Sequence, residues 1–295
     1  MNRHLLALTL ASVLLFPAAA SAQVTDYNIF EEDFLTQSGP GTVTSNPNGW
    51  TFTANLTTAT SNTDDSVSVT APTGTLYVMD TTSPGSSPAT YTYQQGFATQ
   101  SAMEAVFPIA PGTQQYTFGL FSSSLGQDQG TLSFPPVPTY PSAIPSFTNY
   151  AAMQSMNAAQ NFTFTFSGFN VVTGLSEQDL FLDIYNAATN AEVFNDDFLS
   201  PTTTSVTLTG NTLQAGTQYY AVLDYSNRLD TGDFGFGDLN GDAGAGFPTV
   251  FAGLDYNTAA FFTTDSVAVP EPGTIPMFLA GVGLLVLGRR FLRRT

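Results

Sequence analysis

The sequence predicts an all-β protein with two tandem β-sandwich domains, placed between a signal peptide and a short C-terminal membrane helix. One observation behind this prediction is a set of short runs in which apolar and polar residues alternate, such as Phe162 to Phe166. A second is that clusters of Gly, Pro, Asn and Asp separate these runs. A third is that no amphipathic pattern extends over three helical turns between the two ends of the chain. Strands with such spacing and turn clusters are typical of β-sandwiches.

The N-terminus has the parts of a secretory signal peptide. An apolar run follows Arg3 and ends at Phe16, and the small residues Ala20 and Ala22 come next at the spacing that signal peptidase cleaves. We therefore expect the mature chain to begin at Gln23, and we leave the leader out of the fold prediction.

The body of the chain between its two ends is strongly acidic. Its acidic residues are all those of the chain except Glu271, 22 in number, and its only basic residue is Arg228. Its formal charge is therefore 1 − 22 = −21. Such a field repels nucleic acid and anionic membrane surfaces, and we expect neither as a partner. Membrane contact is expected only through the C-terminal tail before processing. The chain has no cysteine, but a body of this length buries enough core without disulfides.

The first half of the body has strands but few distinctive motifs. Alternation predicts strands at Trp50–Leu56, Val67–Val69 and Tyr116–Leu120. The acidic and aromatic opening Phe30–Leu35, followed by the only tryptophan, resembles the start of jelly-roll modules, including glycan-binding ones. The resemblance implies a jelly-roll-like sandwich in which Trp50 binds a sugar ring. The alternative is that Trp50 packs in the core, as scattered aromatic residues of sandwiches do.

A proline-rich segment divides the body. Five prolines fall within FPPVPTYPSAIP, where they remove backbone donors and hold the chain extended, as in a semi-rigid linker. The predicted organisation is a signal peptide at 1–22, a β-sandwich domain at 23–134, a linker at 135–145, a second β-sandwich domain at 146–264 and a sorting signal at 269–295.

The second half has clearer strands. Its predicted strands are Phe162–Phe166, Leu180–Tyr185, Glu192–Phe194, Ser205–Thr209, a strand that starts near Tyr219, and Ala259–Thr263. The stretch from Ser226 to Thr258, between the last two of these strands, reads as an unusually long insertion.

A short motif in this half carries a second resemblance. Leu213, Gly216 and Tyr219 stand in LQAGTQY, which resembles the L-x-x-G-T-x-Y corner of fibronectin type III domains. The resemblance implies a sandwich of the fibronectin type III or immunoglobulin kind, in which Tyr219 hydrogen-bonds back across the turn. The tryptophan usual in the second strand of that family is missing, and Phe166 is the residue that could replace it.

Side-chain oxygens recur at alternate positions inside the insertion, at Asp238, Asn240 and Asp242. Alternation lets a tightly turning chain bring three oxygens to one cation, as in the first half of a calcium loop. Ala243 and Thr249 stand where an EF-hand has glycine and glutamate, so the segment is not an EF-hand. A solvated loop is the structure that these residues form readily without metal, and a weak calcium site is the alternative; we expect no other cofactor.

Residue types limit the chemistry of the mature body. His4 is the only histidine and is lost with the signal peptide, and the chain has neither cysteine nor lysine. Ser-His-Asp and Cys-His hydrolysis, Schiff-base chemistry and His-ligated zinc are therefore excluded. Carboxylates remain, but none stands in a glycosidase motif. We expect a protein that is not an enzyme, with a carboxylate-based glycosidase as the third alternative.

The C-terminal tail carries the most specific signal. Pro270, Glu271 and Pro272 form a triplet, and an apolar run and a cluster of arginines that begins with Arg289 and Arg290 follow it. The apolar run is shorter than the roughly 20 residues of a stable membrane span. This order of parts resembles the PEP-CTERM sorting signal of Gram-negative bacteria, which implies cleavage by a membrane-embedded exosortase near the triplet. The alternative is an ordinary C-terminal membrane helix.

These features together predict an exported structural or adhesive protein of the cell envelope or extracellular matrix. It would be anchored in the inner membrane in transit and would then lie at the cell surface or outside the cell. Exosortase is the expected processing partner, and extracellular polysaccharide and other matrix proteins are further candidate partners. A binding module for extracellular polysaccharide, with Trp50 as the contact residue, is the alternative function.

Overall fold

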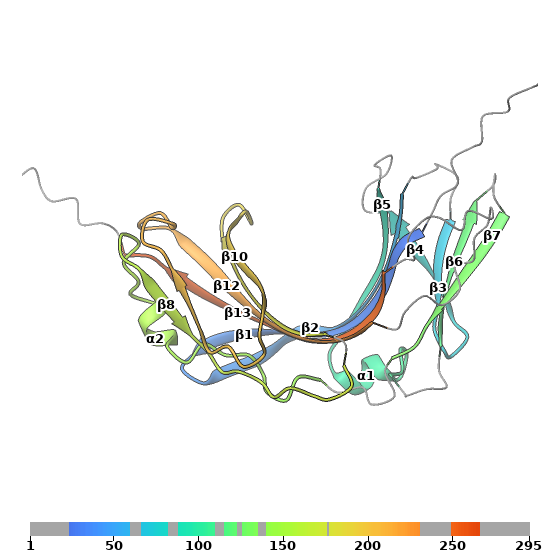
Figure 1. The fold of residues 1–295 in the computed structure, drawn as a ribbon, viewed down its shortest axis with the longest axis horizontal. Coiled ribbons are helices and arrows are strands. Elements are labelled where there is room, and N and C mark those ends of the chain that lie inside the picture. The colour runs from blue at the N-terminus through green and yellow to red at the C-terminus, as the bar shows by residue number, and fades with distance from the viewer. Residues whose placement is uncertain are drawn as a thin grey trace, which may run out of the picture.

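The computed structural model describes residues 24–59, 66–81, 88–109, 115–122, 126–134, 140–175, 177–230 and 249–265. In this part the chain consists of strands and two short helices, and it forms a saddle with two raised sides and a curved floor (Figure 1). The all-β class predicted from the sequence is confirmed. No helix among the described residues is both long enough and apolar enough to cross a membrane.

The first half of the body forms seven strands and one helix. They are β1 (Val24–Gly39), β2 (Thr42–Thr58), β3 (Ser66–Thr70), β4 (Leu76–Thr81), β5 (Ala89–Phe97), α1 (Gln100–Glu104), β6 (Tyr116–Ser122) and β7 (Gly126–Leu132). The second half contributes α2 (Tyr150–Met153), β8 (Phe162–Thr165), β9 (Glu177–Asn186), β10 (Glu192–Leu199), β11 (Ser205–Leu208), β12 (Gln218–Asp230) and β13 (Thr249–Thr263). Each run that alternation predicted as a strand overlaps one of these strands.

Eleven strands form one sheet, in the order β10-β9-β12-β13-β1-β2-β5-β4-β3-β6-β7, and β11 and β8 form a second. In the second half the small sheet packs on the large one, with Phe164 and Val206 facing Leu182 and Leu223 in a shared core. In the first half β4 continues the large sheet into β3, β6 and β7, whose apolar side chains share a core with those of β1 and β2. Both halves are thus sandwiches.

The two halves meet at a parallel pair of strands. β1 runs alongside β13 from Asp26, opposite Thr249, to Gln37, opposite Ala260. The bounds predicted for the long insertion are therefore wrong at both ends, because residues 226–230 belong to β12 and residues 249–258 to β13, while residues 231–248 lie outside the described residues. The apolar and polar alternation typical of a strand is weak in β13, because Gly253, Asp255 and Asn257 occupy positions on one of its faces.

Two apolar cores lie under the same sheet. One is formed by residues of the first half, and the other by residues between Phe147 and Phe262. β13 contributes to both, with Ala252 and Leu254 in the first core and Ala260 and Phe262 in the second. The Pro-rich segment thus separates most residues of the two cores, but the division into two independent domains stays a prediction.

The fibronectin type III-like corner forms as predicted. The backbone N–H of Gln214 donates a hydrogen bond of 2.9 Å to the hydroxyl of Tyr219, whose side chain is buried at the start of β12. Leu213 is buried beside it, and Gly216 has a φ of +67°, a conformation that favours glycine. The motif therefore fixes the turn that leads into β12.

Replacing Tyr219 by phenylalanine is expected to lower the free energy of unfolding by about 0.5–1.5 kcal/mol, because the backbone N–H of Gln214 loses its acceptor in a partly buried hydrogen bond. Urea unfolding of the mature chain measures this change. Tyr220→Phe is the matched control, since the ring of Tyr220 lies on the other face of β12 and stacks on Tyr185. Equal losses in the two variants would show that the corner hydrogen bond contributes no stability.

Candidate functional site: the concave face of the sheet

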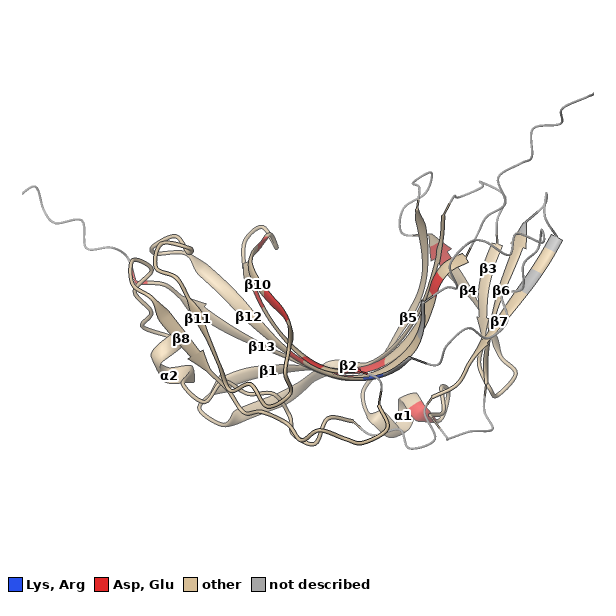
Figure 2. Cartoon of the chain, viewed as in Figure 1, with Lys and Arg blue, Asp and Glu red and all other residues tan. Residues whose placement is uncertain are grey.

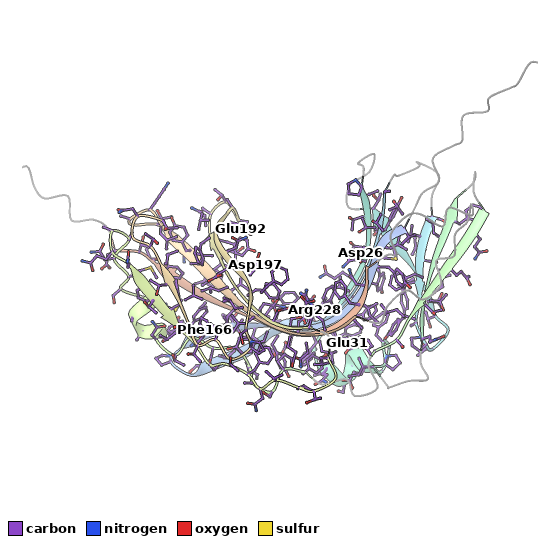
Figure 3. The ribbon with its side chains drawn as sticks, viewed as in Figure 1. Asp26, Glu31, Phe166, Glu192, Asp197 and Arg228 are labelled. Atoms are coloured by element: carbon purple, nitrogen blue, oxygen red, sulfur yellow. The ribbon has the colours of Figure 1, made fainter. Side chains whose placement is uncertain are left out.

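The large sheet has one polar face on its floor, which we refer to as the concave face. It carries alternate residues of the central strands, for example Phe30 and Glu32 on β1 and the residues paired with them on β13 and β2. The opposite face carries the intervening residues, most of which are apolar and belong to the two cores. In Figure 3 Arg228 lies above the floor, whereas Glu31 lies below it.

Acidic residues occur along the strands of the floor and of the raised sides (Figure 2). The strand registers place several of them on the concave face of β1, β13, β12, β9 and β10, with Asp26 apart from the others near the start of β1. These residues, which we name the acidic trough, are Asp26, Glu32, Glu177, Asp179, Asp183, Glu192, Asp197, Asp224 and Asp255.

One row of the trough runs straight across four strands. Glu32 lies opposite Asp255, Asp255 opposite Ser226, and Ser226 opposite Asp179. The hydroxyl of Ser226 donates a hydrogen bond of 2.6 Å to Oδ1 of Asp255 and accepts one of 2.9 Å from Nε of Arg228. The row is therefore a connected polar line in the middle of the sheet.

Arg228 is held between aromatic rings over this row. Its guanidinium carbon lies 5.6, 5.3 and 5.4 Å from the ring centres of Phe30, Phe181 and Phe251. A side chain at Gly253 would approach Phe30 to 2.6 Å, so the glycine makes room for this ring. Rings on three sides fix the charge of Arg228 at the centre of the trough.

Burial dominates the electrostatics of the row. It raises the pKa of Glu32 to about 8, with a further rise from the charge of Asp255, and the pKa of Asp255 to about 6. Burial likewise raises the pKa of Asp179 to about 6 and that of Asp224 well above its usual value. Arg228 lowers each of these pKa values, but burial outweighs it because one cation faces four carboxyl groups.

Three carboxylate oxygens of the trough are buried and accept no hydrogen bond within the described part of the chain. They are Oδ2 of Asp179, Oδ1 of Asp183 and Oδ1 of Asp224. Asp179 is 8% exposed, and its pKa is raised by burial and by the neighbouring Glu177 and lowered by Arg228. These atoms are therefore acceptors in need of donors.

An aromatic platform lies beside the trough. Tyr185 on β9, Tyr220 on β12 and Phe261 on β13 are cross-strand neighbours on the concave face. The rings of Tyr185 and Tyr220 stack with centres 5.1 Å apart, and Phe261 lies 5.5 Å from Tyr220 and is 45% exposed. The platform therefore offers partly exposed aromatic surface on the same face as Asp183, with the ring of Phe261 tilted by 43° to that of Tyr220.

A neutral polar ladder covers the other side of the concave face, on β1, β2 and β5. Asn55 donates a hydrogen bond of 3.0 Å to Asn28 and accepts one of 2.8 Å from Thr92, and Gln94 lies within 3.5 Å of Thr53. This ladder of hydroxyl and amide groups presents both hydrogen-bond donors and acceptors, whereas the acidic side presents mainly carboxyl acceptors.

The structure places Trp50 on the opposite face, away from the trough. It lies under the floor in edge contact with Tyr140 at 5.5 Å and with Tyr256 at 6.3 Å, and it packs against the first core. Glu31 is completely buried nearby and accepts a hydrogen bond of 3.1 Å from Tyr140. The rings around Trp50 are the surroundings that the packing interpretation expects, and a sugar-binding role of Trp50 stays a prediction.

The other predicted site residues lie outside the described residues. They are the cleavage residues Ala20, Ala22 and Gln23, the calcium candidates Asp238, Asn240 and Asp242, and the sorting residues Pro270, Glu271, Pro272, Arg289 and Arg290. Within the described ranges no three acidic or histidine side chains converge closely enough to hold a metal ion.

The calcium prediction can be tested in solution. We expect millimolar calcium to raise the thermal midpoint of the mature chain by a few degrees relative to chelator, because a ligand that binds only the folded state stabilises it. The double variant Asp238→Ala/Asp242→Ala should abolish the difference, and Asp64→Ala/Asp65→Ala is the matched control. An unchanged midpoint in the original chain would leave the segment as a solvated loop.

Sequence reasoning missed the acidic trough, although its pattern is present in the chain. Asp179, Phe181 and Asp183 alternate with leucines, and Asp224, Ser226 and Arg228 alternate in the same way. Each segment alone reads as an ordinary strand with a polar outer face. The signal that could have found the site is that the exposed face of several strands carries acids rather than Thr and Ser.

Comparisons with known proteins match the tail of the chain. Residues 268–294 match the PEP-CTERM protein-sorting motif. No curated protein matches this sequence.

Solved structures with weak similarity are fibronectin modules and larger enzymes. The chicken CNTN1 FN1–FN3 domains are 10% identical to this chain, with a TM-score of 0.23. The match covers 72% of this chain and 62% of that one. The fibronectin(III)-like modules of Clostridium thermocellum CbhA are also 10% identical, with a TM-score of 0.23 and coverage of 81% and 94%. A pullulanase from Anoxybacillus sp. LM18-11 is 12% identical with a TM-score of 0.18, covering 58% of this chain and 22% of its own.

The two sheets and the hydrogen-bonded corner at Tyr219 define the fold, and the PEP-CTERM motif at residues 268–294 defines the tail. PEP-CTERM signals direct a protein out of the cell by way of the inner membrane, where exosortase processes it. The chain is therefore an exported protein with a fibronectin type III-like sandwich and a PEP-CTERM sorting motif at its C-terminus.

Proposed function

We propose that this protein is a structural or adhesive component of the cell surface or extracellular matrix and is not an enzyme. The observation that carries the proposal is the place of β13 in the sheet. β13 leads into the sorting motif, and it is paired along its length with β1 on one side and β12 on the other. The end of the body nearest the sorting motif is thus fastened into the middle of the sheet.

This arrangement suits a protein that bears load. Pulling on the C-terminal end of β13 against a ligand held elsewhere on the sheet loads both ladders along the strand direction. Many hydrogen bonds must then break together, whereas an edge strand pulled sideways loses them one at a time. Cooperative resistance of this kind is what an adhesive protein attached through one end needs.

Polysaccharide binding is the second candidate function, and a different observation favours it. The aromatic platform of Tyr185, Tyr220 and Phe261 lies beside acidic groups and the hydroxyl and amide ladder. Flat rings next to a few polar groups are the usual surroundings of a bound sugar. In this candidate function the sugar binds to the concave face, whereas the prediction from the sequence placed the sugar on Trp50.

The experiment compares producing cells that lack the protein with cells given back either the full chain or a chain that ends before residue 268. We expect loss of cell-to-cell attachment without the protein and full recovery only with the full chain. We also expect the mass of the exported protein to correspond to an end near Pro270, because exosortase cleaves near the triplet.

Three results would count against the proposal. Attachment that does not depend on the protein would contradict an adhesive role. An exported mass that still includes Phe291–Thr295 would contradict cleavage. Release of reducing sugars from polysaccharide by the purified protein, lost in Glu32→Gln, would favour the glycosidase alternative.

A further inference from the structure

We propose that the concave face binds a polysaccharide whose sugars carry free amino groups. The ammonium groups pair with the acidic trough, and the sugar rings lie on the aromatic platform. The inference rests on the proposed function, because it names a ligand class for an adhesive matrix protein.

Charge is the first argument. The trough gathers nine acidic side chains, and Arg228 is the only basic residue between Gln23 and Val269. Arg228 is already engaged by three aromatic rings and by Ser226. No other basic residue of the body can balance the ionised acids of the trough. A cationic ligand would be attracted by their field, and it would favour the ionised form of the acids whose pKa burial raises, such as Glu32 and Asp255.

The buried acceptors are the second argument. Oδ2 of Asp179 is buried in a side chain that is 8% exposed, and it accepts no hydrogen bond from the described residues. The same holds for Oδ1 of Asp183 and Oδ1 of Asp224, which lie on the same face. These three atoms have almost no accessible surface, so a ligand would meet the exposed acids beside them, such as Glu192 and Asp197. An ammonium group offers three donors and no acceptor, so it suits a face on which carboxyl acceptors outnumber donors.

The spread of the acids favours a chain-like ligand over a single ion. Most of them lie on neighbouring strands about 4.8 Å apart, and Glu32, Asp255 and Asp179 share one row that crosses the sheet. Within the described residues no three of them come close enough to surround a metal. A ligand with charges repeated along its length can meet several rows at once.

The rest of the concave face favours a sugar over a basic peptide. The rings of Tyr185 and Tyr220 stack, and the ring of Phe261 beside them is tilted by 43° and is 45% exposed, so the platform offers aromatic surface for a sugar ring and its ammonium group. The ladder of Asn55, Thr92 and their neighbours presents donors and acceptors together, as sugar hydroxyls require. A peptide rich in lysine would leave this neutral half of the face without matching groups.

The test is titration of the full exported chain with four hexamers at low salt, measured by calorimetry. The hexamers are glucosamine, N-acetylglucosamine, glucose in β-1,4 linkage, and lysine. We expect the glucosamine hexamer to bind at least tenfold more tightly than the others, and added salt to weaken this binding, because salt screens the charges.

Variants locate the site. Asp183→Asn/Glu192→Gln should weaken binding of the glucosamine hexamer at least tenfold, because these acids stand next to the platform. Glu104→Gln/Asp265→Asn removes two charges away from the trough and should leave binding within twofold. Circular dichroism of both variants checks that the fold is unchanged.

Each other result overturns the inference in a recognisable way. Equal binding of the glucosamine and N-acetylglucosamine hexamers would remove the requirement for an amine while leaving polysaccharide binding. Tighter binding of hexalysine would point to a basic protein partner. No binding of any hexamer would refute a ligand site for amino sugars on this face, while the attachment experiment tests the adhesive function separately.

Discussion

The variant Phe52→Ala is expected to lose about 3–5 kcal/mol of the free energy of unfolding, because the lost side chain leaves a cavity in a rigid core. Phe52 is completely buried on β2. Its ring stacks on Phe107 with centres 3.9 Å apart and planes 4° apart, and it lies 5.3 Å from the ring of Tyr116. Three aromatic rings in one stack cannot close the gap without moving the backbone. Urea unfolding of the mature chain, followed by circular dichroism, measures the loss.

Phe261→Ala is the matched control for this variant. The side chain of Phe261 is 45% exposed on β13, so its removal exposes little additional apolar surface and leaves no internal cavity. We expect a change below about 1 kcal/mol. Comparable losses in the two variants would mean that the stack around Phe52 is not part of the core.

Stability is expected to fall as the pH rises from about 5 to 9. Burial raises the pKa of Glu32 from 4.5 to about 8 and the pKa of Asp255 from 3.8 to about 6. The folded protein therefore holds these protons more tightly than the unfolded chain does. The stabilisation is complete below the unfolded pKa values and is lost as the pH rises through the folded ones. Thermal midpoints across this range test the direction.

Glu32→Gln isolates the largest single part of this effect. Glutamine keeps the shape but cannot ionise, so we expect it to stabilise the chain at pH 9 by about 2–4 kcal/mol and to change little at pH 5. Asp265→Asn, which changes an exposed carboxyl group past the end of β13, is the matched control. A profile of Glu32→Gln parallel to that of the original chain would show that Glu32 does not control this dependence.

Local patterns in the sequence predicted local structure well. Alternation placed strands where the structure has them, and the motif around Tyr219 predicted a hydrogen bond that is present. Such features depend on neighbours within a few residues, and strand period and turn chemistry encode them directly.

Pairing between distant strands could not be predicted in the same way. Nothing in Val24–Gly39 or Thr249–Thr263 alone states that these segments pair in parallel, because parallel partners are chosen by the packing of the whole sheet. The error over the insertion has the same origin. Gly253, Asp255 and Asn257 interrupt the apolar pattern of β13 because they face Arg228 and the acidic row rather than a core.

The candidate site was missed for a related reason. Its members come from segments that are distant in sequence, and only the sheet registers bring Glu32, Asp179 and Asp255 into one row. Trp50 attracted attention as the only tryptophan, yet its rarity says nothing about its surroundings. Composition identified the charge of the body, but not its concentration on one face.

The parallel pair of β1 and β13 joins both halves of the body into one sheet. The chain has no cysteine, so an engineered pair can be read without competing thiols. Thr36 lies opposite Ala259 on the concave face, and paired strands bring Cα atoms within disulfide range. Val222 lies opposite Ala259 on the next strand, β12, and is therefore two strands from Thr36.

The measurement is the disulfide yield of Thr36→Cys/Ala259→Cys after mild oxidation of the folded protein, compared with that of Thr36→Cys/Val222→Cys. We expect nearly complete formation in the first pair and almost none in the second, with the thermal midpoint of the first unchanged or raised. Absence of the disulfide in the first pair, or equal yields in both, would contradict the single continuous sheet.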